Sequence, residues 1–337
     1  MKRALLAVTR VGWAAAMAAI VTMAATIAPS IAQAQSAATT YPNRSVRVIV
    51  PFPPGGATDI VGRLVAQKLQ ETWGQPFVIE NRAGAGSNIG SDAVAKSAPD
   101  GYTLLVGTIA NATNMSIYPK MPYDTLRDFA PVTQVMSAPS VLVVGLNVPV
   151  SNLQELVAYA KARPGQLSFA SSGAGGSPHL AGEMLKLRAA IDMIHVPYKG
   201  AAPALADVLA SSVTMGFKTA LSAIPHMQSG KLKPIAVAAS KRLAQIPNVP
   251  TMAEAGIADF EVNSWNGFLA PAKTPPEIIA KLQQEIARIL QRAEVRQIFT
   301  AQAAEAVGST PEQFGAYIRS EIDKWAKVVK ASGARID

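Results

Sequence analysis

Ser45-Val-Arg-Val-Ile-Val-Pro-Phe-Pro-Pro-Gly-Gly-Ala-Thr-Asp-Ile-Val-Gly-Arg-Leu-Val-Ala-Gln-Lys-Leu69 predicts a strand, a tight turn and a helix in succession. Residues 46–50 are mostly apolar and β-branched, as in a strand buried on both faces. Residues 53–56 join two prolines, which cannot extend a strand, to two glycines, which permit unusual backbone angles. Thr58 is a favourable N-cap for the helix. A helix therefore begins at a glycine-lined turn, where unpaired N–H groups and the helix dipole favour a small anion.

Two more glycine-rich turns lie between an apolar run and a helical stretch. They are Asn81-Arg-Ala-Gly-Ala-Gly-Ser-Asn-Ile-Gly90 and Ser171-Ser-Gly-Ala-Gly-Gly-Ser-Pro-His179. One such turn alone would mean little, because short glycine-rich connections are common in α/β proteins. Three of them, at the carboxyl ends of strands where open α/β sheets bind ligands, favour a binding site.

The remaining chain alternates between strand and helix patterns, which predicts an α/β fold with a mainly parallel sheet. In its second part the expected order is strand 167–170, helix 178–188, strand 193–198, helix 201–211, strand 213–217, helix 220–228 and strand 234–239. Residues 111–129 lack a clear period and predict a loop with a short helix. Residues 151–154 and 251–254 match the capping box, and Thr310-Pro311 is typical of the start of a final long helix.

Residues 1–34 have the features of a secretory signal peptide. A basic start precedes the apolar run 11–28, and Ala32-Gln33-Ala34 matches a cleavage site. We expect export to the periplasm and a mature protein that is not inserted in the membrane. An uncleaved anchor is the alternative, because the apolar run is near the lower limit for spanning a bilayer. The chain has no cysteine, so neither a disulfide nor a lipidated cysteine is available.

The charge balance argues against nucleic acid as a partner. The chain carries 31 Lys and Arg residues against 22 Asp and Glu, a formal net charge of +9. These basic residues are scattered singly and are not interleaved with aromatic residues. A small anionic ligand fits this composition better.

Three patterns that would indicate chemistry are incomplete. Gly84-x-Gly86-x-x-x-Gly90 is one residue too long for a dinucleotide fingerprint. Ser177 and His179 suggest an exported hydrolase, but the Gly-x-Ser-x-Gly pattern is missing, and a serine before proline is more simply a helix cap. His179 and Glu183 lack a third metal ligand. We expect no enzyme activity, cofactor or metal; the hydrolase remains the alternative, and loss of ester turnover in Ser177→Ala would favour it.

A set of short motifs, in order along nearly the whole mature chain, resembles the Bug family of periplasmic solute receptors for tripartite tricarboxylate transporters. The motifs are Tyr41-Pro-x-Arg44-x-Val46, Val50-Pro-Phe-Pro-Pro-Gly-Gly-Ala-Thr-Asp59, Val78-x-Glu-Asn-Arg-x-Gly84-Ala-Gly86, Pro99-Asp-Gly-Tyr-Thr-Leu104, Val196-Pro-Tyr-Lys-Gly200, Ser229-Gly-Lys-Leu232 and Trp265-x-Gly267-x-x-Ala-Pro271. Each piece alone would be weak, but the combination is highly specific.

The resemblance implies a two-lobed Venus-flytrap fold of the type II periplasmic-binding-protein class. Lobe 1 would comprise residues 41–142 and 262–337, and lobe 2 residues 143–261. A small organic carboxylate would lie between the lobes of a monomer and pass to a large and a small integral-membrane transporter subunit. The same fold could instead present its closed form to a signalling sensor, and the gene neighbourhood would separate the two roles.

The motifs and the chain's own chemistry together indicate a set of ligand-binding residues. They are Pro54, Gly55, Gly56, Ala57, Thr58, Asp59, Thr108, Ser172, Gly173, Ser177, His179, Tyr198 and Lys218. Asp59 is unexpected beside an anion; it can balance the helix dipole or bind an amino group of the ligand. His179 is expected to donate to the ligand or to cap, whereas His195 and His226 are expected to be structural.

Lys218 departs from the family pattern, in which we expect an acidic or small residue after the strand 213–217. An ammonium group facing the cleft could pair with a second carboxylate, which suggests a dicarboxylate ligand. The alternative is a solvated surface lysine. A Lys218→Ala variant that bound every candidate acid as tightly as the wild type would exclude the pairing.

Overall fold

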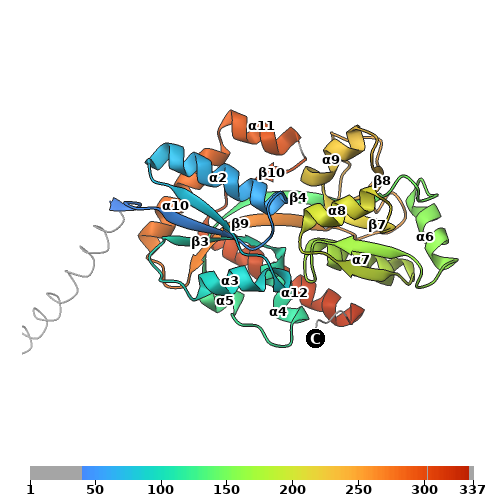
Figure 1. Cartoon of the computed structure of the whole chain (residues 1–337), viewed down its shortest axis with the longest axis horizontal. Helices are drawn as coiled ribbons and strands as arrows, with labels where there is room; N and C mark the ends of the chain where they lie inside the picture. The colour runs from blue at the N-terminus through green and yellow to red at the C-terminus, as the bar shows by residue number, and fades with distance from the viewer. Residues whose placement is uncertain (1–39, 302, 334–337) are drawn as a thin grey trace, which may run out of the picture.

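The computed structural model describes residues 40–301 and 303–333, so the predicted signal peptide and its cleavage site lie outside the described residues. The described chain forms two α/β lobes side by side (Figure 1). Within those residues, no helix combines the length and the apolar character that crossing a bilayer requires.

The first lobe is a mixed sheet with helices on both faces. Its strands are β1 (Val46–Val50), β2 (Phe77–Asn81), β3 (Thr103–Thr108), β9 (Asn263–Pro271) and the first part of β4 (Phe129–Val144). Its helices include α2 (Ala57–Trp73), α3 (Asn88–Ala95), α4 (Ile109–Ile117), α5 (Thr125–Asp128), α10 (Pro276–Leu290) and α11 (Ala293–Ala301). The pairs β1–β2 and β1–β3 are parallel, whereas β3–β9 is antiparallel.

The second lobe repeats the strand and helix alternation that the sequence predicts. Its strands are β5 (Ser168–Ser171), β6 (Ile194–Pro197), β7 (Met215–Thr219) and β8 (Lys233–Ala238). Its helices are α6 (Leu153–Lys161), α7 (Ser177–Ala189), α8 (Ala201–Leu209) and α9 (Ala220–Gln228). The pairs β5–β6 and β5–β7 are parallel.

One long strand, β4, runs through both lobes. Its pairing with β9 extends to Pro139, and from Ser140 it pairs with β7 and β8. Because β4 is antiparallel to β7, β8, β9 and the short β10 (Glu305–Ala306), the sheet as a whole is mixed. The four strands of the second series, β5 to β8, run in the same direction, as the alternation predicts. The lobe boundary expected at residues 142/143 falls inside β4, shortly after its pairing changes from β9 to β7 and β8. The boundary expected at 261/262 falls just before β9. Both boundaries stay a prediction.

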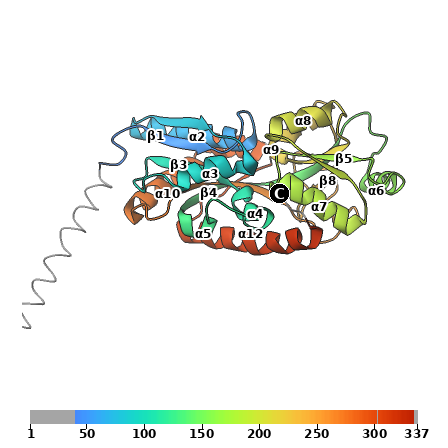
Figure 2. The ribbon, with the colours of Figure 1, turned by 60° about the horizontal axis from the view of Figure 1, so that its bottom comes forward.

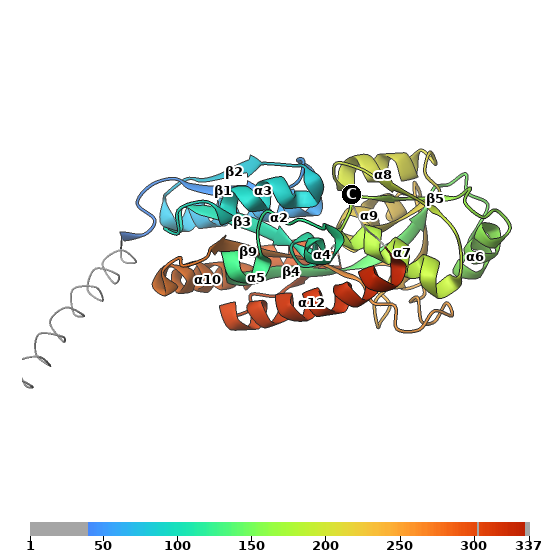
Figure 3. The same cartoon turned by 90° about the horizontal axis from the view of Figure 1, so that it is seen from below.

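Helix α12 (Pro311–Ser332) lies under both lobes and contacts α4 in the first and α7 in the second (Figures 2 and 3). Thr310 caps it as predicted, because its side chain accepts from the Gln313 N–H. Glu321, buried on this helix, accepts hydrogen bonds from the indole N–H groups of Trp265 (3.3 Å) and Trp325 (3.0 Å). The bond between Trp265 and Glu321 therefore fixes helix α12 to strand β9.

Three local predictions differ from the structure. Residues 109–117 and 125–128 form α4 and α5, so the region holds more helix than the predicted loop with one short helix. At the start of α4, Asn111 Oδ1 accepts the Thr108 N–H and Thr108 Oγ1 accepts the Ala110 N–H. Thr251 and Glu254 also make both capping-box bonds, at 3.1 and 2.8 Å, yet they close a turn that no helix follows. At residues 151–154 the N-cap is Asn152, one residue later than expected.

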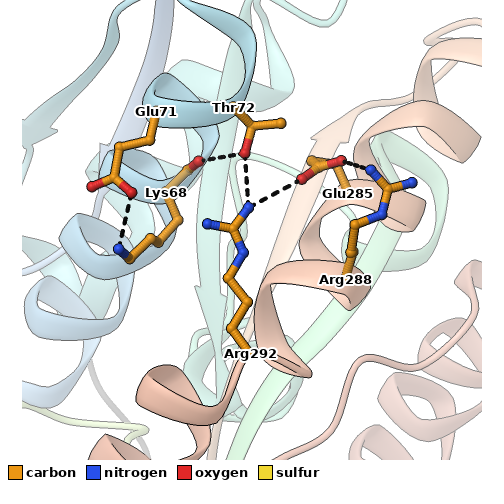
Figure 4. Close-up of polar contacts among 6 residues, drawn as sticks. All are labelled: Lys68, Glu71, Thr72, Glu285, Arg288 and Arg292. Carbon is orange, nitrogen blue, oxygen red and sulfur yellow. Dashed lines mark hydrogen bonds and ion pairs between the residues drawn. The ribbon is translucent and has the colours of Figure 1, made fainter.

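A polar cluster joins the end of α2 to α10 (Figure 4). Glu285 is buried on α10; its carboxylate lies 2.7 Å from Arg288 Nη1 and 3.7 Å from Arg292 Nη2. The same Arg292 nitrogen donates to Thr72 Oγ1 at 3.0 Å, near the end of α2. Arg292 is therefore the member of the cluster that links two helices, whereas Arg288 contacts a residue of its own helix.

We predict that Arg292→Ala lowers the free energy of unfolding by about 1 kcal/mol, because it removes a partly buried link between helices. The matched variant Arg288→Ala should cost less than about 0.5 kcal/mol, since the Arg288 side chain is 70% exposed and the Arg292 side chain 30%. Urea unfolding of the three proteins measures both effects. An equal or larger loss in Arg288→Ala would contradict this assignment.

Candidate functional site

A cavity between the lobes lies where five helices of the described chain begin. It encloses about 710 Å³ of space between atoms, part of it open to solvent. Its wall comprises Phe52, Pro53, Gly56, Ala57, Thr58, Thr108, Ile109, Ser172, Gly176, Ser177, Pro178, Ala201, Phe217, Lys218, Thr219, Ser222, Ser264, Trp265 and Asn266. These residues include the starts of α2, α4, α7, α8 and α9. The helix dipoles therefore place partial positive charge around one space.

The start of α2 leaves donors free on the cavity side. Its first intrahelical bond runs from the Ile60 N–H to the Gly56 carbonyl at 3.0 Å, so the helix itself does not use the amides of residues 57–59. Thr58 is not the N-cap that we expected, because Gly56 takes that position with an extended backbone. Thr58 Oγ1 instead accepts from Asn266 Nδ2 at 3.1 Å, which fixes the helix start to strand β9.

Asp59 lies outside the cavity wall. Its carboxylate accepts from the Gly55 N–H (3.0 Å), Arg63 Nε (2.9 Å) and Asn81 Nδ2 (2.9 Å). Burial opposes ionisation, but the hydrogen bonds from Arg63, Asn81 and Gly55 together hold the pKa of Asp59 below its usual range. The carboxylate is thus saturated by the protein and stabilises the turn before α2.

Ser177 and His179 lie close in sequence but have separate partners. Ser177 is the first residue of α7, Gly176 is the N-cap, and Ser177 Oγ lies 2.6 Å from Ser264 Oγ. The interpretation of Ser177 as the cap is therefore wrong. His179 Nδ1 accepts the Gly175 N–H at 3.1 Å, so this imidazole supports the glycine turn. Neither contact joins the serine to the histidine, as a hydrolase would need.

Two stacked histidines lie behind the same glycine turn. The rings of His179 and His195 are 4.0 Å apart between centroids, and His195 Nε2 lies 2.6 Å from Ser171 Oγ. Burial lowers the pKa of His179 to about 4 and that of His195 to about 3. Both imidazoles are therefore neutral at neutral pH, which lets His179 accept the Gly175 N–H.

Lys218 belongs to the cavity wall on strand β7, and the end of its side chain lies over Gly216 of the same strand. The residue is only 3% exposed, so the alternative of a solvated surface lysine is wrong. Burial lowers the pKa of Lys218 to about 7. Among the described residues, it is the single charged side chain in the cavity wall, and no acidic side chain lines the wall.

The thirteen predicted residues fall into three groups. The cavity wall contains the predicted residues Gly56, Ala57, Thr58, Thr108, Ser172, Ser177 and Lys218, whereas Pro54, Gly55, Asp59 and His179 lie outside it. Gly173 and Tyr198 line a second, adjoining cavity together with the glycine turn 84–87. The Tyr198 hydroxyl donates to Asp207, within its own lobe.

Several wall residues were missed by reasoning from the sequence. Ser264, Trp265 and Asn266 come from strand β9, and Thr219 and Ser222 come from the start of α9. Trp265 belongs to one of the quoted motifs, and this motif was the one feature of the sequence that could have indicated its place in the wall. Its neighbours could not be placed at the cavity without the antiparallel pairing of β9 with β3, about which the local pattern says nothing.

The lobes are closed in this structure. Thr113 on α4 donates to the Gly175 carbonyl of the opposite lobe. A Cβ atom at Gly56 would lie 3.7 Å from Ala201 Cβ, and one at Gly200 would lie 3.0 Å from Pro53 Cδ. A Cβ at Gly175 would overlap Asn114 Oδ1. The glycines of the turns therefore let the two lobes approach at backbone distance.

The described residues contain no cluster of three or more His, Cys, Asp or Glu that could hold a metal ion. What the cavity offers is a set of amide and hydroxyl donors, one buried amine and the aromatic side chains Phe52, Phe217 and Trp265. Such a wall can bind and enclose a small anion.

Two α/β lobes closed over such a cavity define the class of two-lobed solute-binding receptors. The family model for the tripartite tricarboxylate transporter family receptor matches residues 61–334, and the chain belongs to this family. Protein BugT of Bordetella pertussis is 44% identical over 303 residues, which cover 89% of this chain and 92% of BugT. The Bug resemblance is thereby confirmed.

Solved structures of similar proteins agree. Rpa4515 of R. palustris, solved with adipate, has a TM-score of 0.84 and 37% identity, and the match covers 87% of this chain and 98% of that one. MatC of Rhodopseudomonas palustris, solved with bound malate, has a TM-score of 0.82 and 34% identity over 86% of this chain and all (100%) of that one. The predicted two-lobed fold is confirmed.

We predict that Gly175→Ala prevents full closure, because the added methyl group meets Asn114 across the lobes and the residue has φ +83°. Affinity for a stabilising solute should fall roughly tenfold or more. Gly74→Ala is the matched control, since Gly74 has φ +68° with no atom within 4 Å of its Cβ position. Calorimetry and small-angle scattering measure affinity and closure; equal binding by both variants would contradict the prediction.

We predict that the free energy of unfolding decreases as the pH falls from about 6.5 towards 4. The pKa values of His179 and His195 are lowered in the folded protein, so the unfolded chain binds more protons in this window. His179→Asn keeps an acceptor for the Gly175 N–H without a titrating ring, and it should make this pH dependence shallower. Chemical unfolding at several pH values tests the slope; a variant as steep as the wild type would count against it.

Proposed function

We propose that this protein is an exported receptor that captures a small organic carboxylate between its lobes and delivers it to a tripartite membrane transporter. The observation that carries the proposal is the meeting of five helix starts at one cavity, in whose wall Lys218 is the one ionisable side chain among residues 40–301 and 303–333. Unpaired N–H groups at helix starts are a common site for carboxylates. The helix starts therefore attract an anion, and no acidic group repels one from the part of the wall that the structure describes.

Hydrogen bonding of this kind is strong enough for a receptor. Three or four charge-assisted hydrogen bonds contribute roughly 1.5–3 kcal/mol each, against association costs of at least ~4 kcal/mol. The balance permits binding at about −8 kcal/mol, which corresponds to micromolar affinity. Closure excludes water from these bonds, and a ligand that contacts both lobes favours the closed form.

The relatives support a carboxylate as the ligand. The structure of Rpa4515 is described with adipate and that of MatC with bound malate, and both proteins match almost their whole length to this chain. We extend the class of ligand, small organic acids, to this protein. The particular acid differs between these two relatives, so it has to be measured.

We further propose that the protein has no catalytic activity. The Ser177 hydroxyl is hydrogen-bonded to the Ser264 hydroxyl, and His179 Nδ1 accepts the Gly175 N–H. Among the described residues, His179 therefore does not act as a general base for Ser177. The proposed partners are a large and a small integral-membrane subunit, which a monomeric receptor meets in the periplasm. Membership of the transporter receptor family supports these partners.

A thermal-shift panel of mono-, di- and tricarboxylates tests the proposal. At about 100 times its Kd, a true ligand should add about 2.7 kcal/mol to the free energy of unfolding. The methyl esters of the same acids are the matched controls, because they lack the charge that the helix starts bind. A panel in which no acid stabilises the protein, or in which esters stabilise it equally, would overturn the proposal.

Delivery to a transporter is tested in cells. A strain that lacks this protein should lose uptake of the stabilising acid, and a plasmid copy should restore it. Unchanged uptake would refute delivery to a transporter, but it would not contradict binding of the acid by this protein.

A further inference from the structure

Strand β9 reaches the starts of two helices, one in each lobe, through polar side chains. Ser264 Oγ lies 2.6 Å from Ser177 Oγ at the start of α7 in the second lobe. Asn266 Nδ2 donates to Thr58 Oγ1 at 3.1 Å, at the start of α2 in the first lobe. All four residues belong to the cavity wall. The position of β9 therefore affects where both helix starts lie.

Trp265, which stands between these two strand residues, is bonded to helix α12. Successive side chains of a strand point to opposite faces. The Trp265 ring meets Phe314 edge-on, with the ring centroids 5.5 Å apart, and it meets Tyr317 at 5.9 Å. Its N–H donates to Glu321 Oε2 at 3.3 Å. Three residues of α12, none of them in the described wall, therefore hold this side chain.

The Glu321 carboxylate has a fixed orientation. Its Oε2 accepts the Trp325 N–H at 3.0 Å as well as that of Trp265, and its Oε1 lies 2.6 Å from Lys324 Nζ. Glu321 is only 4% exposed, so these partners offset the cost of burying a carboxylate. Because both oxygens are engaged, the Trp265 N–H has one defined place to donate to.

Helix α12 lies against β9 at a distance that only a glycine permits. A Cβ atom at Gly267 would overlap Phe314 Cζ, and it would lie 2.8 Å from the Thr133 carbonyl oxygen. The same helix contacts α4 and α7, which both begin at the cavity (Figures 2 and 3). Helix α12 therefore supports a strand and two helices that contribute to the wall.

We propose that Glu321 is a positioning residue of the ligand-binding site. It holds the Trp265 indole and thereby the place of β9, and Ser264 and Asn266 carry this constraint to the starts of α7 and α2. Hydrogen bonds weaken steeply when donor and acceptor are misaligned, so a displaced helix start binds an anion less well. The inference rests on the proposed function and adds a residue that sets affinity without touching the ligand.

The test replaces Glu321 and measures affinity by calorimetry, well below the unfolding temperature, with adipate and malate as probes. Glu321→Leu keeps a side chain of similar size but removes the acceptor, and affinity should fall about tenfold. Glu321→Gln keeps an amide oxygen that can accept both indole N–H groups. Its affinity should stay within about twofold of that of the wild type.

Trp325→Phe is the matched control. It removes the other indole that donates to Glu321 Oε2 and leaves the bond from Trp265 in place. Since Trp325 is fully buried, this variant should be less stable than the wild type, yet its affinity should be unchanged. A loss of stability alone then cannot account for weaker binding by Glu321→Leu.

Two results of these titrations would overturn the inference and leave the carboxylate receptor intact. One is wild-type affinity in Glu321→Leu, and the other is an equal loss of affinity in Trp325→Phe. If neither adipate nor malate binds the wild type, the acid that stabilises it most in the thermal-shift panel replaces them. If no acid stabilises it, the proposed function fails, and this inference fails with it.

The indole N–H resonances of the wild type, followed by NMR, give a second readout if Glu321→Leu folds poorly. Saturation with the bound acid should shift the resonances of Trp265 and Trp325, because both donate to one oxygen of Glu321. Trp73, which packs against Tyr41 outside the wall, should not shift. An unchanged Trp325 resonance, or an equal shift of Trp73, would overturn the inference.

Discussion

The amide groups that begin five helices are the constraint on which the site depends. Each start needs acceptors that the helix cannot supply, and the fold directs the starts of α2, α4, α7, α8 and α9 to one cavity. The protein's own side chains meet part of this need, as when Asn111 accepts the Thr108 N–H before α4. At α2 the need is left open, and an anionic ligand can satisfy it.

Closure follows from the same turns, because their glycines let the lobes approach without side chains between them. Gly56 meets Ala201 and Gly175 meets α4 across the cleft. The lobes share strand β4, and helix α12 contacts elements of both, so continuous structure joins them. Under the proposed function, a ligand held by backbone groups of both lobes would favour the closed form.

Burial sets the protonation of the groups around this cavity. It keeps His179 neutral, so that the ring accepts a backbone N–H and holds the glycine turn in place. It also lowers the pKa of Lys218 to about 7, and no acidic side chain accompanies this lysine in the described wall. Asp59 behaves oppositely: its three protein donors keep it charged and remove it from any role towards a ligand.

The sequence alone determined the α/β class, most helix and strand segments, the family and the glycine-lined start of α2, because these depend on short-range patterns and contiguous motifs. Tertiary structure decided which turns share a cavity: the turn around Gly86 lines a neighbouring one, while Ser264 and Asn266 enter the wall from β9. It also buried Lys218, which the sequence left equally free to face solvent. The physical reason is that cavity walls and burial arise from pairing between distant strands, such as β3 with β9 and β4 with β7, and no local pattern encodes that pairing.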